Sequence, residues 1–307
     1  NWKDSTGNYR GTSTTPIWQW NATNNDPSQA VDGDGYSCFQ IYSDTNAVDP
    51  HTTSHPIKKI PHHLGYLHSS LINNEHNDAY CSQLQYTMEV NQNNSLLTFN
   101  YAMVLEAPGH SLYENPTFQI EVMKHDPNNP ALILNQLVDS CAFFEKVGQN
   151  SNVTAEPTVW YSDGSTYDGW VWCKWQQIKI NLARYVGDRI TMKFRIGDCS
   201  QFGHGGYGYV VAKAEKPTIE VAGCAGDGDT VTLAHAPSGF ASYKWFAIPS
   251  LTSNQETLAQ YDASATTLGT DSVFAIRESM MNGETQRFFA VKLISPRTQT
   301  TRPICVA

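Results

Sequence analysis

Several features that mark other protein classes are scarce or missing in this sequence of 307 residues. No apolar run is long enough to span a bilayer, so we expect no membrane-spanning segment. Only 16% of the residues are charged and the net charge is −9. A general nucleic-acid binder needs a basic face to meet phosphates, so we expect no nucleic-acid partner. The chain starts at Asn1 without an apolar leader, which we interpret as an exported protein whose signal has been removed.

The sequence also lacks the short motifs of common catalytic and metal sites. It contains no GxSxG, no P-loop and no HExxH. Its seven cysteines form no CxxC pair, which argues against a thioredoxin motif or a zinc ribbon. Nothing in the sequence sets the separation between two carboxylates that glycoside hydrolysis requires. These absences favour a protein without catalytic activity.

What the sequence does contain is typical of an extracellular β protein. Aromatic residues make up 11% of the chain, with eight Trp and fifteen Tyr, and Asn, Thr, Ser and Gly are plentiful. From Tyr80 onward, strand-length runs such as TFQIEVMK and RITMKFRI are separated by turn signals such as DPNNP. No convincing helical period extends over ten residues, apart from a turn or two near 279–282. We therefore predict an all-β fold.

The strand pattern divides into two domains. Residues 1–213 are predicted to form a jelly-roll β-sandwich with a polar, irregular N-terminal extension. A short linker around Pro217 follows. Six short strands in residues 214–307 predict a smaller immunoglobulin-like β-sandwich, with Trp245 on a central strand of its core.

The cysteines of an exported protein are expected to lie mostly in disulfides. Cys224 and Cys305 bracket the second domain and are the firmest predicted pair. Because seven is an odd number, at least one cysteine is free or pairs outside the chain. The others, whose pairing stays open, are Cys38, Cys81, Cys141, Cys173 and Cys199.

Three stretches of the first domain resemble a known module. They are LLTFNYAMVLEAPGHSLYENPTFQIEV, CAFF and WQQIKINLARYVGDRITMKFRIGDCSQFGHGGYGYVV. In this order they resemble a module of Bacteroidetes surface proteins, adhesin-like and gliding-associated, similar in outline to MAM-type and carbohydrate-binding jelly rolls. The following GDTVTLAHAPSGFASYKWF resembles the immunoglobulin-like repeat of the same proteins. The resemblance implies export, a β-sandwich and an adhesive or ligand-binding role, and it implies no catalytic residues.

The glycine-rich stretch GDCSQFGHGGYGYVV, residues 197–211, holds both a Cys and a His. One hypothesis is a thiolate–imidazole pair of Cys199 and His204, but the nearby acid Asp198 falls on the opposite strand face from Cys199. The favoured interpretation is a strand–loop–strand with left-handed glycines and with Cys199 in a disulfide. The family it resembles has an acid where Val211 stands, so no ion site is carried over.

If the chain holds a structural ion, the sequence favours calcium, because loops of extracellular jelly rolls often supply oxygen ligands. The candidate ligands are Asp32 and Asp34 in VDGDG, and Asp163 and Asp168 in SDGSTYDGW. Neither loop is a complete EF-hand, and Asp-Gly is first of all a turn signal. Six His between positions 51 and 76 are interpreted as polar residues of a surface insert, with a native metal site as the alternative; adventitious zinc or nickel binding is favoured over a native site.

The stretch VWYSDGSTYDGWVWCKW has the ingredients of a glycan site: rings to stack on sugar faces and polar side chains for hydroxyls. Trp160, Tyr161 and Trp170 are the predicted ligand-binding residues, because the loop between them would lie at the sandwich edge. Core packing is the competing interpretation for these aromatic residues. Along an unbroken strand, Trp170 and Trp172 share one face and Trp175 lies on the other.

These observations predict a non-catalytic binding or adhesion module of a secreted or cell-surface protein. Its partner would be a glycan or an extracellular protein. Two alternatives stay open: a structural stalk or filament segment of a large surface protein, and an accessory part of a carbohydrate-active enzyme. We expect the chain to be part of a larger chain or assembly.

Overall fold

The computed structural model describes residues 2–24, 30–138, 142–155, 159–165, 168–224, 231–237, 240, 242–252, 255–281, 286–294 and 304–306. Within them the chain is mostly β, as predicted, and it forms two compact units. The first unit comprises Asn1–Met88, Phe99–Gln177 and Arg189–Ala212. The second comprises Glu89–Thr98, Ile178–Asp188 and Lys213–Ala307. The division into domains 1–213 and 214–307 stays a prediction.

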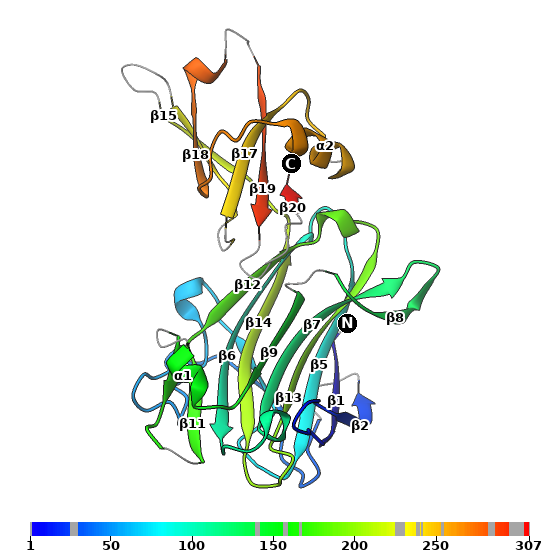
Figure 1. Ribbon diagram of the computed structural model, residues 1–307, viewed down its shortest axis with the longest axis vertical. Coiled ribbons are helices and arrows are strands. Elements are labelled where there is room, and N and C mark those ends of the chain that lie inside the picture. Colours follow the sequence, from blue (N-terminus) through cyan, green and yellow to red (C-terminus); the bar gives the residue numbers. More distant parts are fainter. Residues whose placement is uncertain are drawn as a thin grey trace. The chain divides into compact units, whose positions relative to one another are not determined.

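Two seven-stranded sheets form the predicted jelly-roll sandwich, whose long strands are seen in Figure 1. Sheet I has the order β2-β1-β5-β13-β7-β8, and β9 also pairs with β7. Its strands are β1 (Trp2–Tyr9), β2 (Trp18–Asn24), β5 (Tyr80–Glu89), β7 (Thr117–Asp126), β8 (Asn129–Leu137), β9 (Phe143–Val147) and β13 (Arg189–Gly197). Sheet II has the order β10-β11-β6-β14-β4-β3, and β12 also pairs with β6. Its strands are β3 (Phe39–Tyr42), β4 (Ser69–Ile72), β6 (Leu96–Ala107), β10 (Trp160–Ser162), β11 (Gly169–Cys173), β12 (Gln176–Asn181) and β14 (Gly206–Glu215).

Apolar side chains that alternate along the strands build the core of the sandwich. Phe118, Ile120 and Val122 on β7 are fully buried, as are Phe194 and Ile196 on the paired strand β13. This is the period-2 pattern from which the strands were predicted. Strand β6 is buried along almost its whole length, which indicates that both of its faces are covered.

The N-terminal part is not the irregular extension that the sequence predicts. Strand β1 pairs with β5 over seven residues, from Trp2 opposite Tyr86 to Asn8 opposite Tyr80, and β2 pairs with β1. The prediction is wrong because β1 is rich in residues of low β propensity, such as Asp4 and Asn8. Backbone pairing with β5 and β2 nevertheless makes this segment a strand.

Residues 43–68, between β3 and β4, form an insert that packs against sheet II; we call it the β3–β4 insert. It folds back on itself through a bridge between Val48 and Lys58, and it contains the short 3₁₀ turn η2 (His62–Leu64). Ile57 of the insert is buried in one cluster with Trp172 and Tyr209 of the sheet. The predicted surface insert therefore covers part of one sheet face.

A buried carboxylate anchors this insert to the sheet. Asp49 is only 3% exposed, and its Oδ2 accepts hydrogen bonds from the hydroxyls of Tyr207 (2.8 Å) and Tyr209 (2.7 Å) on β14. Its Oδ1 accepts from the backbone amide of His51 at 2.9 Å. One side chain thus joins the backbone of the insert to two buried phenols of sheet II.

The stretch 197–211 is a strand–loop–strand, as predicted, between β13 and β14. The left-handed residue in it is Phe202, with a φ of 65°, so the prediction of left-handed glycines is wrong. Gly206 is needed for close packing instead, because a Cβ there would lie 2.9 Å from side-chain atoms of Leu105 and Pro116. Cys199 is a buried free thiol, which contradicts its predicted disulfide.

The second unit contains two three-stranded sheets, as expected for a small sandwich. They are β15 (Glu220–Cys224), β16 (Val231–His235) and β18 (Val273–Arg277), and β17 (Ser242–Ile248), β19 (Phe288–Ile294) and β20 (Ile304–Val306). Trp245 is 1% exposed and stacks on Phe274 at a ring distance of 5.2 Å, so the predicted core position of Trp245 is confirmed. The side chains of the predicted pair Cys224 and Cys305 lie outside the described residues.

One ten-residue helix was not predicted. Besides η2, the described helical elements are α1 (Ser151–Ala155), α2 (Gln255–Ser264), η3 (Leu112–Glu114), η5 (Ala183–Tyr185) and η6 (Glu278–Met281). The apolar face of α2 is short and interrupted: Leu258 is buried and Tyr261 packs in the same cluster, but the buried Asp262 beside them forms ion pairs with Lys244 (2.8 Å) and Lys292 (2.7 Å). A helix held by charges in this way leaves little helical period. Within the described part of the chain, no helix has the length and apolar character to cross a bilayer.

Candidate ligand-binding site

A hollow of about 270 Å³ opens on the first unit beside β3, β4 and β14. Its wall combines aromatic and imidazole rings with amide, ammonium and carboxylate groups. The side chains that carry this chemistry are Tyr36, Gln40, Tyr42, Lys59, Asn74, Glu75, His76, Tyr207 and Tyr209. Concave sites of mixed ring and hydrogen-bonding character are the usual form of small-ligand sites.

Rings at the rim of the hollow are accessible. Tyr36 is 47% exposed and stacks on His76, with ring centroids 3.4 Å apart and an interplanar angle of 14°. The Nζ of Lys59 lies 4.3 Å from the ring centre of Tyr42 and donates to its hydroxyl at 3.2 Å. That hydroxyl donates to Oε1 of Gln40 at 2.9 Å. These contacts hold the rim groups in defined positions before any ligand arrives.

The inner wall of the hollow is formed by neutral phenols. Burial, and then the negative charge of Asp49, raise the pKa values of Tyr207 and Tyr209 far above the usual range. Both hydroxyls therefore stay protonated and donate to Asp49. At the rim, the exposed Glu75 pairs with Nε2 of His51 at 3.0 Å. The polar character of the hollow thus comes from its rim more than from its inner wall.

Trp160 does not belong to any exposed platform. Its side chain is 2% exposed, and β10 pairs it with Cys173 of β11. Tyr161, the next residue, packs on the opposite face, in the cluster under the insert. Since successive side chains of a strand point to opposite faces, Trp160 lies on the inner side of the sandwich. The prediction that Trp160 stacks on a ligand is therefore wrong.

Tyr161 and Trp170 lie on the outer face of sheet II, but histidines of the β3–β4 insert cover them. The ring of His55 stacks on Tyr161 at 3.9 Å, and the ring of His51 stacks on Trp170 at 4.3 Å. Trp170 also contacts Tyr207 at 5.7 Å. Both predicted rings are half-buried, so each already has a partner ring from the chain itself.

The two remaining tryptophans of this stretch are also tied to the insert. Trp172 donates from Nε1 to the carbonyl of His55 at 3.2 Å, and Trp175 donates to the carbonyl of Lys58 at 2.7 Å. Trp175 lies in the same cluster as Trp172, because the strand ends at Cys173 and the chain bends before β12. The expectation of opposite faces assumed an unbroken strand.

The first pair of predicted calcium ligands is engaged in local hydrogen bonds. Oδ1 of Asp32 accepts from the backbone amides of Asp34 and Tyr36, both at 2.9 Å. Oδ2 accepts from the side-chain amide of Asn74 at 2.9 Å. Asp34 in turn accepts from the hydroxyl of Tyr80 at 3.4 Å. The turn predicted from VDGDG is confirmed, and calcium binding here stays a prediction.

The second pair of predicted calcium ligands is divided between two partners. Asp163 accepts from the backbone amides of Ser165 (2.9 Å) and Trp170 (3.0 Å), so it closes its own loop. Asp168 instead pairs with Nε2 of His204 at 2.9 Å. Asp163 and Asp168 therefore bind different partners within the chain. A calcium site at this loop stays a prediction.

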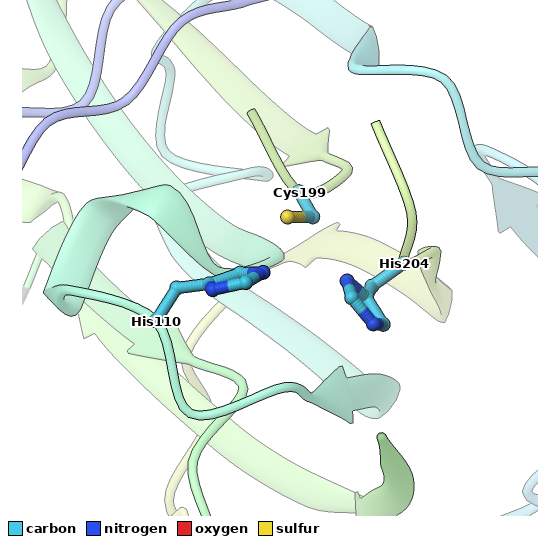
Figure 2. A group of neighbouring side chains, drawn as sticks. All are labelled: His110, Cys199 and His204. Atoms are coloured by element: carbon cyan, nitrogen blue, oxygen red, sulfur yellow. The ribbon is translucent and has the colours of Figure 1, made fainter. Parts of the chain in front are cut away.

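The sequence indicates only two members of a further cluster, Cys199 and His204. His110, Cys199 and His204 have ligand atoms that all lie within 4.8 Å of one another (Figure 2). Among the described residues, this is the one group of three or more His, Cys, Asp or Glu side chains that could hold a metal ion. Asp198 accepts from Asn73 at 2.8 Å and does not join it. His110 is about ninety residues from its partners in sequence, and no local motif marks it.

No protein-family model matches this chain, and no curated protein matches it. Three solved structures are similar to it at low identity. The glycoside hydrolase domain of Endo-D from Streptococcus pneumoniae R6 has 8% sequence identity and a TM-score of 0.24, and the match covers 87% of this chain and 36% of that one. The adhesin domain of Epf from Streptococcus pyogenes has 8% identity and a TM-score of 0.20, with 98% of this chain and 90% of that one covered. Carbohydrate-binding modules of the β-sandwich superfamily have 12% identity and a TM-score of 0.24, with 70% of this chain and 73% of that one covered. The chain thus spans about a third of the glycoside hydrolase domain. Likenesses at these TM-scores carry no conclusion about function.

Proposed function

We propose that the first unit is a non-catalytic binding module that recognises a glycan in the hollow beside β3, β4 and β14. The observation that carries the proposal is the accessible Tyr36–His76 ring pair next to the side chains of Gln40, Lys59 and Glu75. A sugar presents an apolar C–H face and a ring of hydroxyls. The rings suit the first, and the amide, ammonium and carboxylate groups suit the second.

The size of the hollow supports a small recognition element. Its volume of about 270 Å³ lies just below the range for small-ligand sites, roughly 300 to 1,000 Å³. A terminal sugar or a short branch therefore suits it better than a long polysaccharide chain. The extracellular location belongs to the same proposal, supported by the polar, aromatic-rich composition with few charged residues.

A glycan array followed by calorimetric titration tests this function. We expect the full chain to bind a subset of glycans and Tyr36→Ala to weaken the best binding at least tenfold. Gln40→Ala should weaken it less, because one neutral hydrogen bond contributes about 0.5–1.5 kcal/mol. The matched control is Phe143→Ala, which removes a 37% exposed ring on β9, outside the hollow, and should leave binding unchanged.

The outcomes distinguish a glycan-binding module from a stalk and from a domain that cleaves the glycan itself. An empty array, or binding that Tyr36→Ala does not change, would refute the proposed hollow; the empty array would favour a stalk. Incubating the bound glycan with the protein and analysing the products tests the enzyme alternative. Shorter products would contradict a non-catalytic role, and an unchanged glycan supports it.

A further inference from the structure

The loops that follow β6 and β13 bring together one thiol and two imidazoles. We propose that His110, Cys199 and His204 form a binding site for a zinc-class divalent cation. Sulfur and imidazole nitrogen are the ligands that zinc prefers in proteins, whereas calcium takes oxygen ligands. This site is independent of the proposed glycan hollow, whose wall contains none of the three residues.

The backbone fixes two of the ligands in one loop. The amide of Cys199 donates to the carbonyl of His204 at 2.8 Å, and the amide of Phe202 donates to the carbonyl of Cys199 at 3.2 Å. These bonds close residues 199–204 into a compact turn between β13 and β14. The Cys and the second His therefore keep a constant separation, as ligands on a rigid element should.

The third ligand comes from the β6–η3 loop, which is held by a buried amide side chain. Asn115 is fully buried; its Oδ1 accepts from the amide of His110 at 3.1 Å and its Nδ2 donates to the carbonyl of His110 at 3.4 Å. The backbone of His110 is thus clamped from both sides. Figure 2 shows the rings of His110 and His204 converging beside Cys199 from the two loops.

The hydrogen bond of His204 identifies which nitrogen faces the cluster. Nε2 of His204 lies 2.9 Å from Oδ1 of Asp168. Nδ1 is buried, and among the described atoms it has no hydrogen-bond partner. A histidine that donates one ring N–H to a carboxylate and offers the other nitrogen as a ligand is the usual arrangement in zinc sites. Asp168 is therefore a positioning residue for His204.

The surroundings of Cys199 also suit a metal-bound thiolate. Its side chain is buried, and the backbone amide of Gln201 donates to Sγ at 3.3 Å. Such an amide stabilises negative charge on sulfur, and a metal ion supplies the remaining compensation. The buried thiol lies within 4.8 Å of the ligand atoms of two imidazoles, which places a soft donor beside two nitrogen donors.

Metal binding requires a small contraction of the cluster. Bonds of about 2.0–2.3 Å in a tetrahedral site place ligand atoms roughly 3.4–3.6 Å apart, whereas here they lie within 4.8 Å of one another. A closure of about 1 Å by side-chain rotation is enough. Three protein ligands leave a fourth position for water or an exogenous ligand.

Cobalt is a spectroscopic probe for such a site because it occupies zinc sites and reports a sulfur ligand directly. We expect Co²⁺ to bind the full chain in a one-to-one complex with a thiolate-to-metal charge-transfer band, and Zn²⁺ to displace it. Cys199→Ser should abolish the band. His204→Gln and His110→Gln should each weaken binding at least tenfold. Asp168→Asn should keep the band and weaken binding about 10- to 100-fold, since Asn tolerates the left-handed φ of 53° there.

The controls distinguish this site from adventitious binding by surface histidines. His62→Gln and His68→Gln remove exposed imidazoles of the insert and should leave the band and the affinity unchanged. Thermal melting checks that each variant folds; should Cys199→Ser not fold, His110→Gln and Asp168→Asn still decide the question. No binding, binding without a charge-transfer band, or binding lost in the His62 and His68 variants and kept in His110→Gln would overturn the proposal.

Discussion

The two halves of the outer face of sheet II have similar aromatic residues but differ in exposure. One half is covered by another segment of the chain, and the other is open. In the covered half, Trp170 and Tyr161 lie under His51 and His55 of the β3–β4 insert. In the open half, the rings of Tyr36 and His76 stack on each other at the rim of a hollow. The aromatic residues do not decide which half is accessible to solvent. The path of the chain above them does.

Asp49 is the point where the two halves meet. It holds the backbone of the insert, and it accepts from Tyr207 and Tyr209, whose rings also line the hollow. Removing this carboxylate should disturb both halves, whereas removing the exposed ring of Tyr36 should disturb only the open half.

The largest effect is therefore expected for Asp49→Ala. Two buried phenol hydroxyls would lose their acceptor, at about 1–3 kcal/mol each, so the free energy of unfolding should fall by about 3 kcal/mol or more. Urea denaturation measures it. The control Asp44→Ala removes an exposed carboxylate that caps only the amide of Asn46, and surface changes of this kind usually stay within about 0.5 kcal/mol. Equal losses in both variants would show that Asp49 is no anchor.

An alkaline pH titration is expected to have the next largest effect. The folded state raises the pKa of Tyr207 and Tyr209, so their stabilising contribution is complete below the unfolded value of about 10 and is lost as pH rises above it. At pH 11 the two phenols together should lower the free energy of unfolding by about 3 kcal/mol.

Urea denaturation at stepwise pH measures that slope, and tyrosinate absorbance follows the ionisation. The variant Tyr207→Phe should show a smaller loss between pH 9 and pH 11. Ionisation of all tyrosines near pH 10 in the folded chain would contradict the buried phenol pair.

The smallest effects distinguish the halves directly. His51→Ala removes the ring that stacks on Trp170 and should destabilise by about 0.5–1.5 kcal/mol. It should also increase acrylamide quenching of tryptophan fluorescence, because it uncovers an indole. His76→Ala removes the matching ring in the open half and should leave quenching unchanged. Equal quenching in the two variants would mean that the insert does not shield Trp170.

Features that depend on local pattern could be predicted from the sequence. Alternating apolar residues predicted the long strands, Asp-Gly predicted the turn at Asp32, and Trp245 was placed in the core of the second unit. The strands β1 and β2 and the helix α2 could not be predicted in this way. Backbone pairing with β5 stabilises β1, and the ion pairs of Asp262 help to hold α2. Neither kind of contact produces a regular spacing of apolar residues in the sequence.

The candidate sites depend on contacts between distant segments, so the sequence indicated only parts of them. Cys199 and His204 are five residues apart and were visible as a pair. His110 joins them only because the ends of β6 and β13 meet in the folded unit. The exposed state of a ring is set in the same way: Trp160 and Trp170 have similar sequence surroundings, yet one faces the core and the other the insert.

The β3–β4 insert contacts the sheet through side chains, its backbone bridge between Val48 and Lys58 joins two of its own residues, and no strand of the sheet runs through it. Its attachment points lie in the scaffold: Asp49 on Tyr207 and Tyr209, and the indole N–H groups that meet backbone carbonyls. A backbone carbonyl accepts a hydrogen bond whatever side chain its residue carries. The exposed positions between the anchors can therefore change without cutting a β-ladder, whereas the buried Thr52 and Ile57 are fixed by packing. Because the insert lies over part of one sheet face, its length and its exposed side chains determine how much of that face reaches solvent.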